Sequence, residues 1–328
     1  MRKAPTEAIL SKISKQKFGD DDKKCYLCLR RKNKSMITDD KKERYINPYT
    51  DFGFKRLFGT EMNKDLLISF LNSILGNGDI GIRDIQYLNS ERLGVSYGDR
   101  KSVFDVYCET ENHSKLIVEM QKAEQRFFKD RSIYYAAVPI REQAPKGKWD
   151  YHLENVYTVG ILDFVFPENE YPEQSYRHEV KLKDVEDNHV FYDKLTFIYL
   201  EMPKFTKTED ELETMADKWM FAVRNLSRLL DRPKALQDRV FKKFFEQAEI
   251  ARYTPEERRD YEESVKIYRD YINTLDTAHD KGYESGRAKG RAEGRAEGLQ
   301  DVARKMKGMG ISLETIIDAT GLSREEID

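Results

Sequence analysis

Residues 104–122 read FDVYCETENHSKLIVEMQK, in which two apolar runs stand on either side of a polar turn. The alternation of side chains within each run predicts two antiparallel strands joined as a hairpin. Each run also carries one carboxylate where an apolar residue would be expected, Asp105 in the first and Glu119 in the second. A functional reading of the chain has to explain these two acids.

The register of the hairpin decides how close the two acids lie. If Glu109 pairs with Lys115 across the turn, Asp105 comes to lie directly opposite Glu119. Cross-strand neighbours have β-carbons about 4.5–5.5 Å apart, a spacing at which like charges destabilise a sheet. We therefore expect a compensating charge. Gln121 lies on the same face as Glu119 and can both donate and accept hydrogen bonds.

A divalent cation would compensate the two acids. Mg²⁺ accepts one or two protein carboxylates and completes its shell with water and substrate phosphate oxygens. Such a metal stabilises charge on a phosphoryl transition state and lowers the pKa of a bound water, which Gln121 could orient. The alternative is a solvated face on which each acid pairs with a lysine. The spacing alone leaves both readings open, because the register is assumed.

Composition bounds the class of protein. The chain has 328 residues, of which 39% are hydrophobic, enough for one large or two ordinary domains with a core. The net charge of -2 neither suggests nor excludes a nucleic-acid partner, since such a partner needs only a local basic patch. No run of about 18 apolar residues occurs, so no membrane span is expected. Three cysteines and no secretory leader favour a cytoplasmic protein.

The pattern along the chain predicts four segments. Residues 1–43 are a polar, charged extension that we expect to be disordered; Met36 within it offers an alternative start, and its single CxxC, Cys25 and Cys28, lacks the second half of a zinc site. Residues 44–205 have the alternating helix and strand patterns of an α/β domain with a mixed sheet. Residues 206–275 are expected to be a helical appendage, and 276–328 a helical tail.

Within the α/β segment, two packed helices are expected before the sheet. The predicted strands cover 82–88, 102–109, 115–121, the apolar run 155–166 and 194–200. Residues 123–144 read as a helix whose inner stripe includes Phe127, Phe128, Arg131, Tyr134, Tyr135 and Val138.

The tail repeats glycine every fourth residue from Gly282 to Gly298. Each glycine inside a helix costs about 1 kcal/mol relative to alanine, so a charged linker and a self-associating helix pair both remain open. The final stretch ISLETIIDATGLSREEID resembles a small helix-turn-helix without a clearly basic recognition helix. A homo-oligomer formed through the glycine repeat is therefore one expectation.

Several segments, taken in order, resemble a known family. They are INPYTDFGFKRLFGTE, the aspartate of FDVYCE, VEMQKA, FFKDRSIYYAA and YTVGILDFVF. Together they are similar to the Rpn family of recombination-promoting nucleases and transposases, within the PD-(D/E)XK nuclease superfamily. The resemblance runs from about Tyr45 through the helical region, and the glycine-repeat tail is also typical. It implies a mixed central sheet flanked by helices and a helical C-terminal region.

The resemblance also implies a site and an activity. Asp105, Glu119 and Gln121 take the catalytic positions, with the two acids as ligands of Mg²⁺ or, in its place, Mn²⁺. The implied activity is endonucleolytic cleavage of DNA that promotes recombination or transposition. Gln121 stands where the superfamily has lysine, which removes a positive charge from the site. Lys122 is adjacent but is expected to point to the opposite face.

Two further residues are weaker candidates. Asp51 begins the first helix, where an acid favours the helix dipole, although a related position adds a metal ligand in some relatives. Arg131 and Lys122 are weak candidates for substrate binding; Arg131 could instead pair with a buried acid or stack on Tyr135.

Three functions remain in view. The first is the metal-dependent DNA endonuclease. The second is a catalytically inactive protein that retains the nuclease fold for DNA binding or interaction. A phosphodiesterase acting on RNA or small nucleotides is the third. The paired acids favour an enzyme, since a scaffold has no reason to hold two carboxylates face to face.

Overall fold

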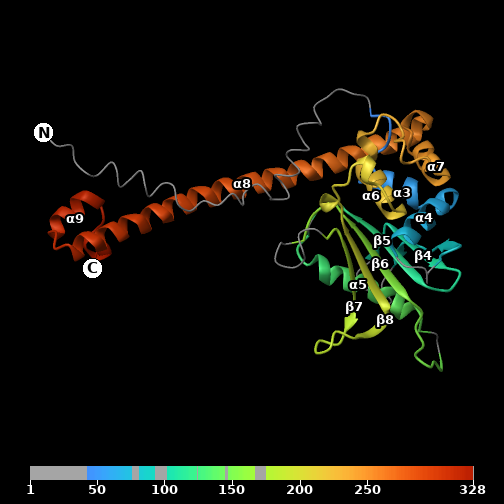
Figure 1. Ribbon diagram of the computed structural model, residues 1–328, viewed down its shortest axis with the longest axis horizontal. Coiled ribbons are helices and arrows are strands. Elements are labelled where there is room, and N and C mark those ends of the chain that lie inside the picture. Colours follow the sequence, from blue (N-terminus) through green and yellow to red (C-terminus); the bar gives the residue numbers. More distant parts are fainter. Residues whose placement is uncertain are drawn as a thin grey trace. The chain divides into compact units, whose positions relative to one another are not determined.

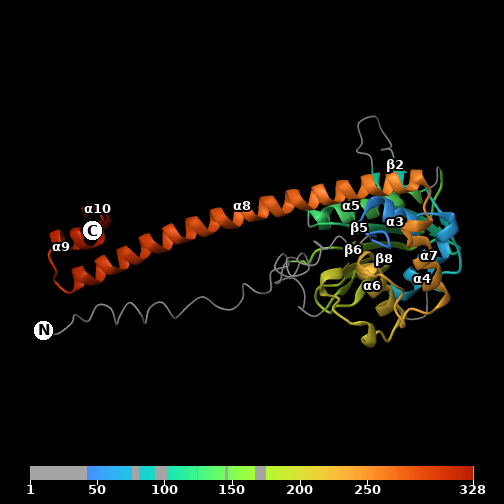
Figure 2. The same cartoon turned by 90° about the horizontal axis from the view of Figure 1, so that it is seen from above.

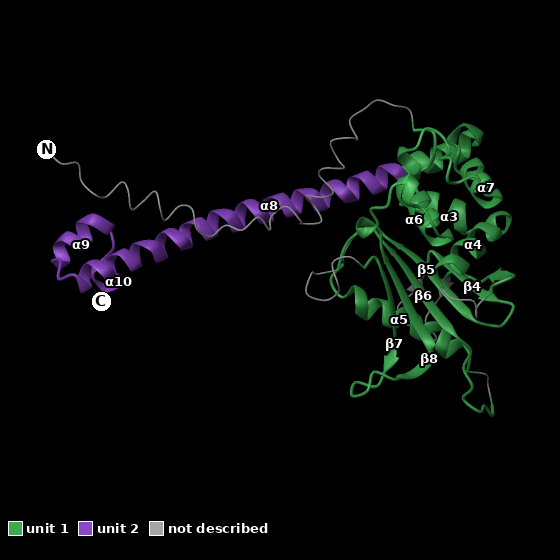
Figure 3. Cartoon of the chain, in the orientation of Figure 1, with its two compact units in different colours: residues 1–264 green, residues 265–328 purple. Residues whose placement is uncertain are grey.

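The computed structural model describes residues 43–75, 81–92, 102–123, 125–144, 147–166 and 175–327. The expected extension therefore lies outside the described residues except for Glu43, and so do Cys25 and Cys28. The chain divides into two compact units, residues 1–264 and 265–328 (Figure 3).

The first unit is built on a six-stranded sheet with the order β1-β4-β5-β6-β8-β7 (Figure 1). Its strands are β1 (Ile85–Tyr87), β4 (Val106–Thr110), β5 (Lys115–Gln121), β6 (Val156–Leu162), β7 (Arg177–Lys183) and β8 (Val190–Glu201). The central strands β5, β6 and β8 are parallel neighbours, while β1, β4 and β7 pair antiparallel. A separate ribbon pairs β2 (Glu91–Arg92) with β3 (Ser102–Val103). The expected mixed sheet is confirmed.

Helices precede, interrupt and follow the sheet. The α-helices are α3 (Asp51–Phe58), α4 (Lys64–Ile74), α5 (Phe128–Glu142), α6 (Met215–Asn225), α7 (Arg239–Ala248), α8 (Pro255–Gly308), α9 (Leu313–Thr320) and α10 (Arg324–Ile327). Short 3-10 turns occupy Glu61–Asn63, Met202–Lys204, Glu209–Glu211, Leu226–Arg228 and Ile250–Arg252. In the described part of the chain, no helix combines the length and the apolar character that crossing a bilayer requires.

Helix α5 covers one face of the sheet, and Figure 2 shows the strands between α5 on one side and α4 and α6 on the other. The hydroxyl of Ser132 on α5 lies 2.8 Å from that of Tyr199 on β8. Tyr199 stands in register with Gly160, which in turn stands in register with Glu119. Because residues in register point to the same side of a sheet, α5 lies over the face that carries Glu119.

Aromatic side chains join the helices of the first unit away from α5. Trp219 on α6 is fully buried, and its indole N–H donates to the hydroxyl of Ser69 at 3.1 Å. Its ring contacts four phenylalanines, Phe58, Phe70, Phe241 and Phe244, with centroids 4.8–5.9 Å apart. The helices expected as an appendage after residue 206 thus share a core with α3 and α4.

The strand predicted over 102–109 is wrong as a single element, because the chain breaks between β3 and β4. The Phe104 N–H donates to the carbonyl of Ser90 at 2.9 Å, outside the hairpin ladder. Asp105 bonds to β5 through its side chain, whose Oδ2 lies 2.7 Å from the N–H of Met120, and its backbone hydrogen-bonds the carboxylate of Glu119. Strand β7 was not predicted, since its sequence RHEVKLK is rich in charge.

Helix α5 forms as predicted, but its inner stripe is narrower than the sequence suggested. Phe128 is buried, whereas Phe127 is 65% exposed and Tyr134 is 51% exposed. Phe127 adopts a left-handed conformation (φ 65°) just before the helix, so it lies outside the helical periodicity. Tyr134 follows the outer face.

The second unit continues α8 and closes with two short helices. The glycine repeat is helical without a break, since α8 runs from Pro255 to Gly308. Ser312 caps α9, and Gly321 ends it in the left-handed conformation (φ 71°) that glycine tolerates. Apolar side chains of α8, α9 and α10 form a small core of their own, which includes Ala303, Ile316, Leu322 and Ile327.

Gly53 sets the entry of α3. The hydroxyl of Thr50 caps the helix by accepting the Gly53 N–H at 3.0 Å. A β-carbon at residue 53 would lie 2.1 Å from the backbone oxygen of Asn47 and 2.8 Å from the Thr50 hydroxyl. Only glycine therefore fits this turn without movement of the backbone.

We predict that Gly53→Ala lowers the free energy of unfolding by about 1–3 kcal/mol, because the new methyl group collides with backbone. Gly290→Ala is the matched control: a β-carbon there meets nothing within 4 Å, and alanine should favour the helix by about 1 kcal/mol. Urea unfolding followed by circular dichroism measures both. A Gly53→Ala protein as stable as the parent would contradict the assigned collision.

Candidate active site

The hairpin of β4 and β5 has the register predicted from the sequence. Tyr107 pairs with Ile117 and Glu109 pairs with Lys115, so the paired residues share one face of the sheet. Two residues beyond Ile117 on the same face of β5 comes Glu119. The pairing of the two strands starts at Val106 and Val118, directly after the bend that contains Asp105.

Asp105 is attached to β5 by its side chain. Its Oδ2 accepts the backbone N–H of Met120 at 2.7 Å, which places the carboxylate next to the strand position of Glu119. Burial raises the pKa of Asp105, and the Met120 N–H offsets part of this effect because it donates to the charged form. The side chain is thus a largely buried acid held in one orientation.

Glu119 is the more strongly perturbed of the two acids. Burial, followed by the negative charge of Asp105, raises the pKa of Glu119 to about 8. The charge of Arg131 and the backbone of Asp105 lower it. Oxygen Oε1 of Glu119 is buried and has no hydrogen-bond partner among the described residues. Buried polar atoms are nearly always bonded, so this oxygen is available to a group outside the described residues.

The two acids fit a divalent cation. Hard cations of the Mg²⁺ type bind through one or two carboxylates and keep several waters. In the described ranges, no three His, Cys, Asp or Glu side chains are grouped as a metal centre, so Asp51 does not join Asp105 and Glu119 as a third ligand in this conformation. The candidate metal site therefore consists of the two carboxylates of Asp105 and Glu119, with Oε1 of Glu119 buried and unbonded.

Helix α3 brings further charges to Asp105. Asp51 raises the pKa of Asp105, whereas Lys55 and Lys122 lower it, which shows that all three lie within electrostatic range. Lys55 forms an ion pair with Asp51 at 3.1 Å. Sequence reasoning missed Lys55 as a neighbour of the site; its spacing of four residues from Asp51 on the same helix was the available signal.

Both ends of the Gln121 side chain are hydrogen-bonded within the protein. Its side chain is buried at 7% exposure, and Nε2 donates to the carbonyl of Ala123 at 3.0 Å. Its Oε1 accepts a hydrogen bond from the guanidinium of Arg131 on α5. A second donor of Arg131 binds the Oε1 of Gln125. The structure therefore brings Arg131 to the face of the sheet that carries Glu119, where it contacts Gln121.

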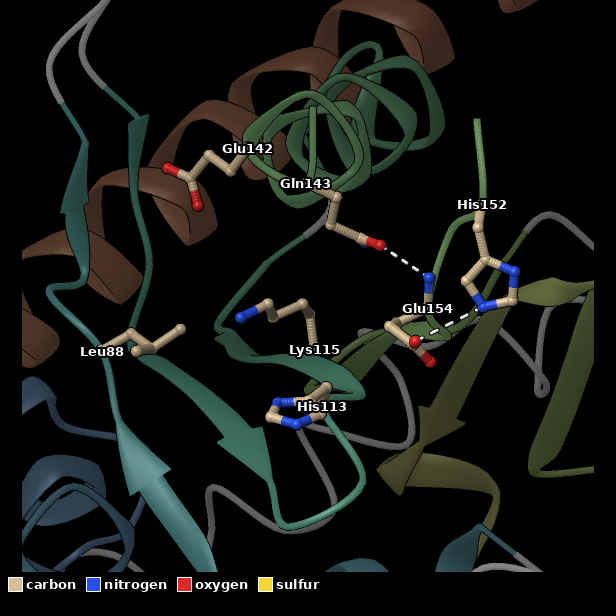
Figure 4. A pocket seen from close by; sticks show the side chains of 7 residues that line it. All are labelled: Leu88, His113, Lys115, Glu142, Gln143, His152 and Glu154. Carbon is tan, nitrogen blue, oxygen red and sulfur yellow. Dashed lines mark hydrogen bonds and ion pairs between the residues drawn. The ribbon is translucent and has the colours of Figure 1, made fainter. Parts of the chain in front are cut away.

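A cavity of about 430 Å³ lies elsewhere (Figure 4). It is lined by charges of both signs, among them Lys115, Glu142 and Glu154. Lys115 is the first residue of β5, whereas Glu119 and Gln121 lie toward its end. The lining of the cavity contains none of the predicted site residues.

Comparison with known proteins agrees with the fold. No curated protein and no solved structure matches the chain. A family described as PD-(D/E)XK nuclease family transposase matches residues 48–278, more than half of the sequence and all six strands of the sheet. The mixed sheet and the flanking helices are consistent with that match. The chain therefore belongs to the PD-(D/E)XK nuclease family transposases.

Proposed function

We propose that this protein is a Mg²⁺-dependent DNA endonuclease that hydrolyses phosphodiester bonds and promotes recombination or transposition. Membership of a nuclease transposase family supports the reaction class. The observation that carries the proposal is the buried, unbonded Oε1 of Glu119 beside the half-buried carboxylate of Asp105. Two such acids raise each other's energy unless a cation lies between them.

Asp105 and Glu119 are the residues that would hold the cation, with Mn²⁺ able to replace Mg²⁺. The metal supplies positive charge to the phosphoryl transition state and makes a bound water more acidic. In the described chain, the buried Oε1 of Glu119 lacks a hydrogen-bond partner, so this acid keeps an oxygen for a ligand. The Met120 N–H holds Asp105 in place through Oδ2.

The reaction itself is a simple exchange of bonds. Water adds its oxygen to phosphorus, one phosphate ester bond breaks, and the departing alkoxide takes up a proton. Duplex DNA is the proposed substrate, bound mainly through phosphate contacts with little readout of sequence. Self-association through α8 stays a prediction: a β-carbon at any of its five repeat glycines would meet nothing within 4 Å in the single chain.

The first test is the nicking of supercoiled plasmid in Mg²⁺, Mn²⁺ or EDTA. We expect cleavage only with metal, and Asp105→Asn and Glu119→Gln should each lower the rate by about 10²-fold or more, because each removes a charge needed at the transition state. Glu109→Gln is the matched control. Glu109 is a carboxylate on the same hairpin that pairs with Lys115 at its other end, and this variant should cleave as the parent does.

Three outcomes decide the proposal. Cleavage that persists in both site variants would contradict the assignment of Asp105 and Glu119. Cleavage in EDTA would contradict the requirement for a metal. A parent protein that binds DNA but never cuts it would favour the alternative, a catalytically inactive nuclease fold.

The raised pKa of Glu119 predicts a pH-dependent stability. Between its unfolded value near 4.5 and its folded value of about 8, the folded state binds a proton that the unfolded state has lost. Stability therefore falls as pH rises through this window. In EDTA, the loss from pH 5 to pH 8 should be smaller for Glu119→Gln than for the parent, by about 1–3 kcal/mol.

Mg²⁺ or Mn²⁺ should restore the stability of the parent at pH 8, since a cation binds the deprotonated acid and only in the folded state. Glu119→Gln should gain little. Urea unfolding at several pH values, with and without metal, measures both effects. Equal pH dependence in the two proteins would show that Glu119 is not the titrating group.

A further inference from the structure

The amide of Gln121 is fixed in orientation by two partners of opposite kind. The carbonyl of Ala123 can only accept, and the guanidinium of Arg131 can only donate. Turning the amide over would set donor against donor and acceptor against acceptor. Each end of the Gln121 amide thus has a partner in the protein, and through its Oε1 the side chain acts on Arg131.

Arg131 is held from several sides. The side-chain oxygens of Gln121 and Gln125 accept hydrogen bonds from its two terminal nitrogens. Its guanidinium lies 5.8 Å from the ring centre of Phe128 and 5.7 Å from that of Tyr135. These contacts use the flat faces and part of the donor set of the guanidinium. Further N–H donors remain for a ligand.

The charge of Arg131 has no carboxylate attached to it. Across the described residues, both of its hydrogen-bond acceptors are neutral amides, and no acid lies within ion-pair distance. Its field nevertheless reaches the acid pair, because it lowers the pKa of Glu119. A half-buried, oriented cation that has no direct ion pair among the described residues is suited to bind an anion.

We propose that Arg131 contacts the scissile phosphate and supplies the positive charge that a lysine at the position of Gln121 would supply, and that Gln121 is the positioning residue for its guanidinium. This inference rests on the proposed nuclease function. Compared with a site that has lysine at this position, the positive charge lies on helix α5 instead of strand β5. The amide of Gln121 links the strand to the guanidinium of Arg131. An arginine suits the task because its planar fork can bind two phosphate oxygens at once.

Binding of a labelled DNA duplex in EDTA tests the phosphate contact without cleavage. Arg131→Gln should reduce the slope of log K against log salt by about 0.9, the value of one phosphate contact. Arg131→Lys should keep the slope, since it keeps the charge. Arg141→Gln is the matched control: Arg141 is an exposed arginine in the last turn of the same helix, and its slope should equal that of the parent.

A relocation of charge tests the catalytic role. Arg131→Gln should lower the single-turnover cleavage rate by about 10²-fold or more. Adding Gln121→Lys to that variant returns a cation to the strand and should recover about tenfold or more of the lost rate. Gln121→Ala should lower the rate while Arg131 and its charge remain. Circular dichroism on every variant separates these effects from loss of the fold.

The outcomes separate this inference from the proposed function. If the parent cleaves DNA and Arg131→Gln cleaves equally well, Arg131 has no such role and the nuclease stands. If the parent does not cleave, the nuclease proposal fails, and an unchanged salt slope in Arg131→Gln would then overturn the phosphate contact as well. If Gln121→Lys does not restore the cleavage rate of the Arg131→Gln variant, a lysine on the strand is not equivalent to Arg131 on the helix.

Discussion

The hydrogen bond from the Met120 N–H to Oδ2 of Asp105 holds the candidate site together. It joins the Asp105 side chain to the backbone of β5 at the point where β3 and β4 separate. The chain can therefore leave the hairpin toward β2 while the carboxylate stays against β5. Without this bond, Asp105 would have no reason to remain in a buried position beside Glu119.

Charged side chains from two helices act on the two acids of the site. Helix α3 brings Asp51 and Lys55 within range of Asp105, and helix α5 brings Arg131 within range of Glu119. The position of α3 depends on the tight turn at Gly53, and that of α5 on its packing over the sheet. Two buried acids are expensive to keep, so these surrounding cations and an added metal ion both act to lower the same electrostatic energy.

Membership of a nuclease transposase family establishes what kind of fold this is, and the site has to establish the chemistry. The position that carries lysine in the parent superfamily carries Gln121 here. Members of the family that the sequence resembles are similar in carrying glutamine there, so the exchange alone does not argue against activity. The contact between Gln121 and Arg131 brings a positive charge from helix α5 next to that position.

Local sequence pattern was sufficient for the hairpin of β4 and β5, the buried strand β6 and helix α5, since period and turn residues act over short distances. It also singled out Asp105 and Glu119, because two acids in apolar runs violate that pattern. Burial of the pair, the unbonded oxygen of Glu119 and the break before β4 came only from tertiary structure. Lys55 reaches the site from a helix distant in sequence, and long-range packing decides where such a side chain lies. Arg131 was a candidate from the sequence, but its contact with Gln121 came only from tertiary structure.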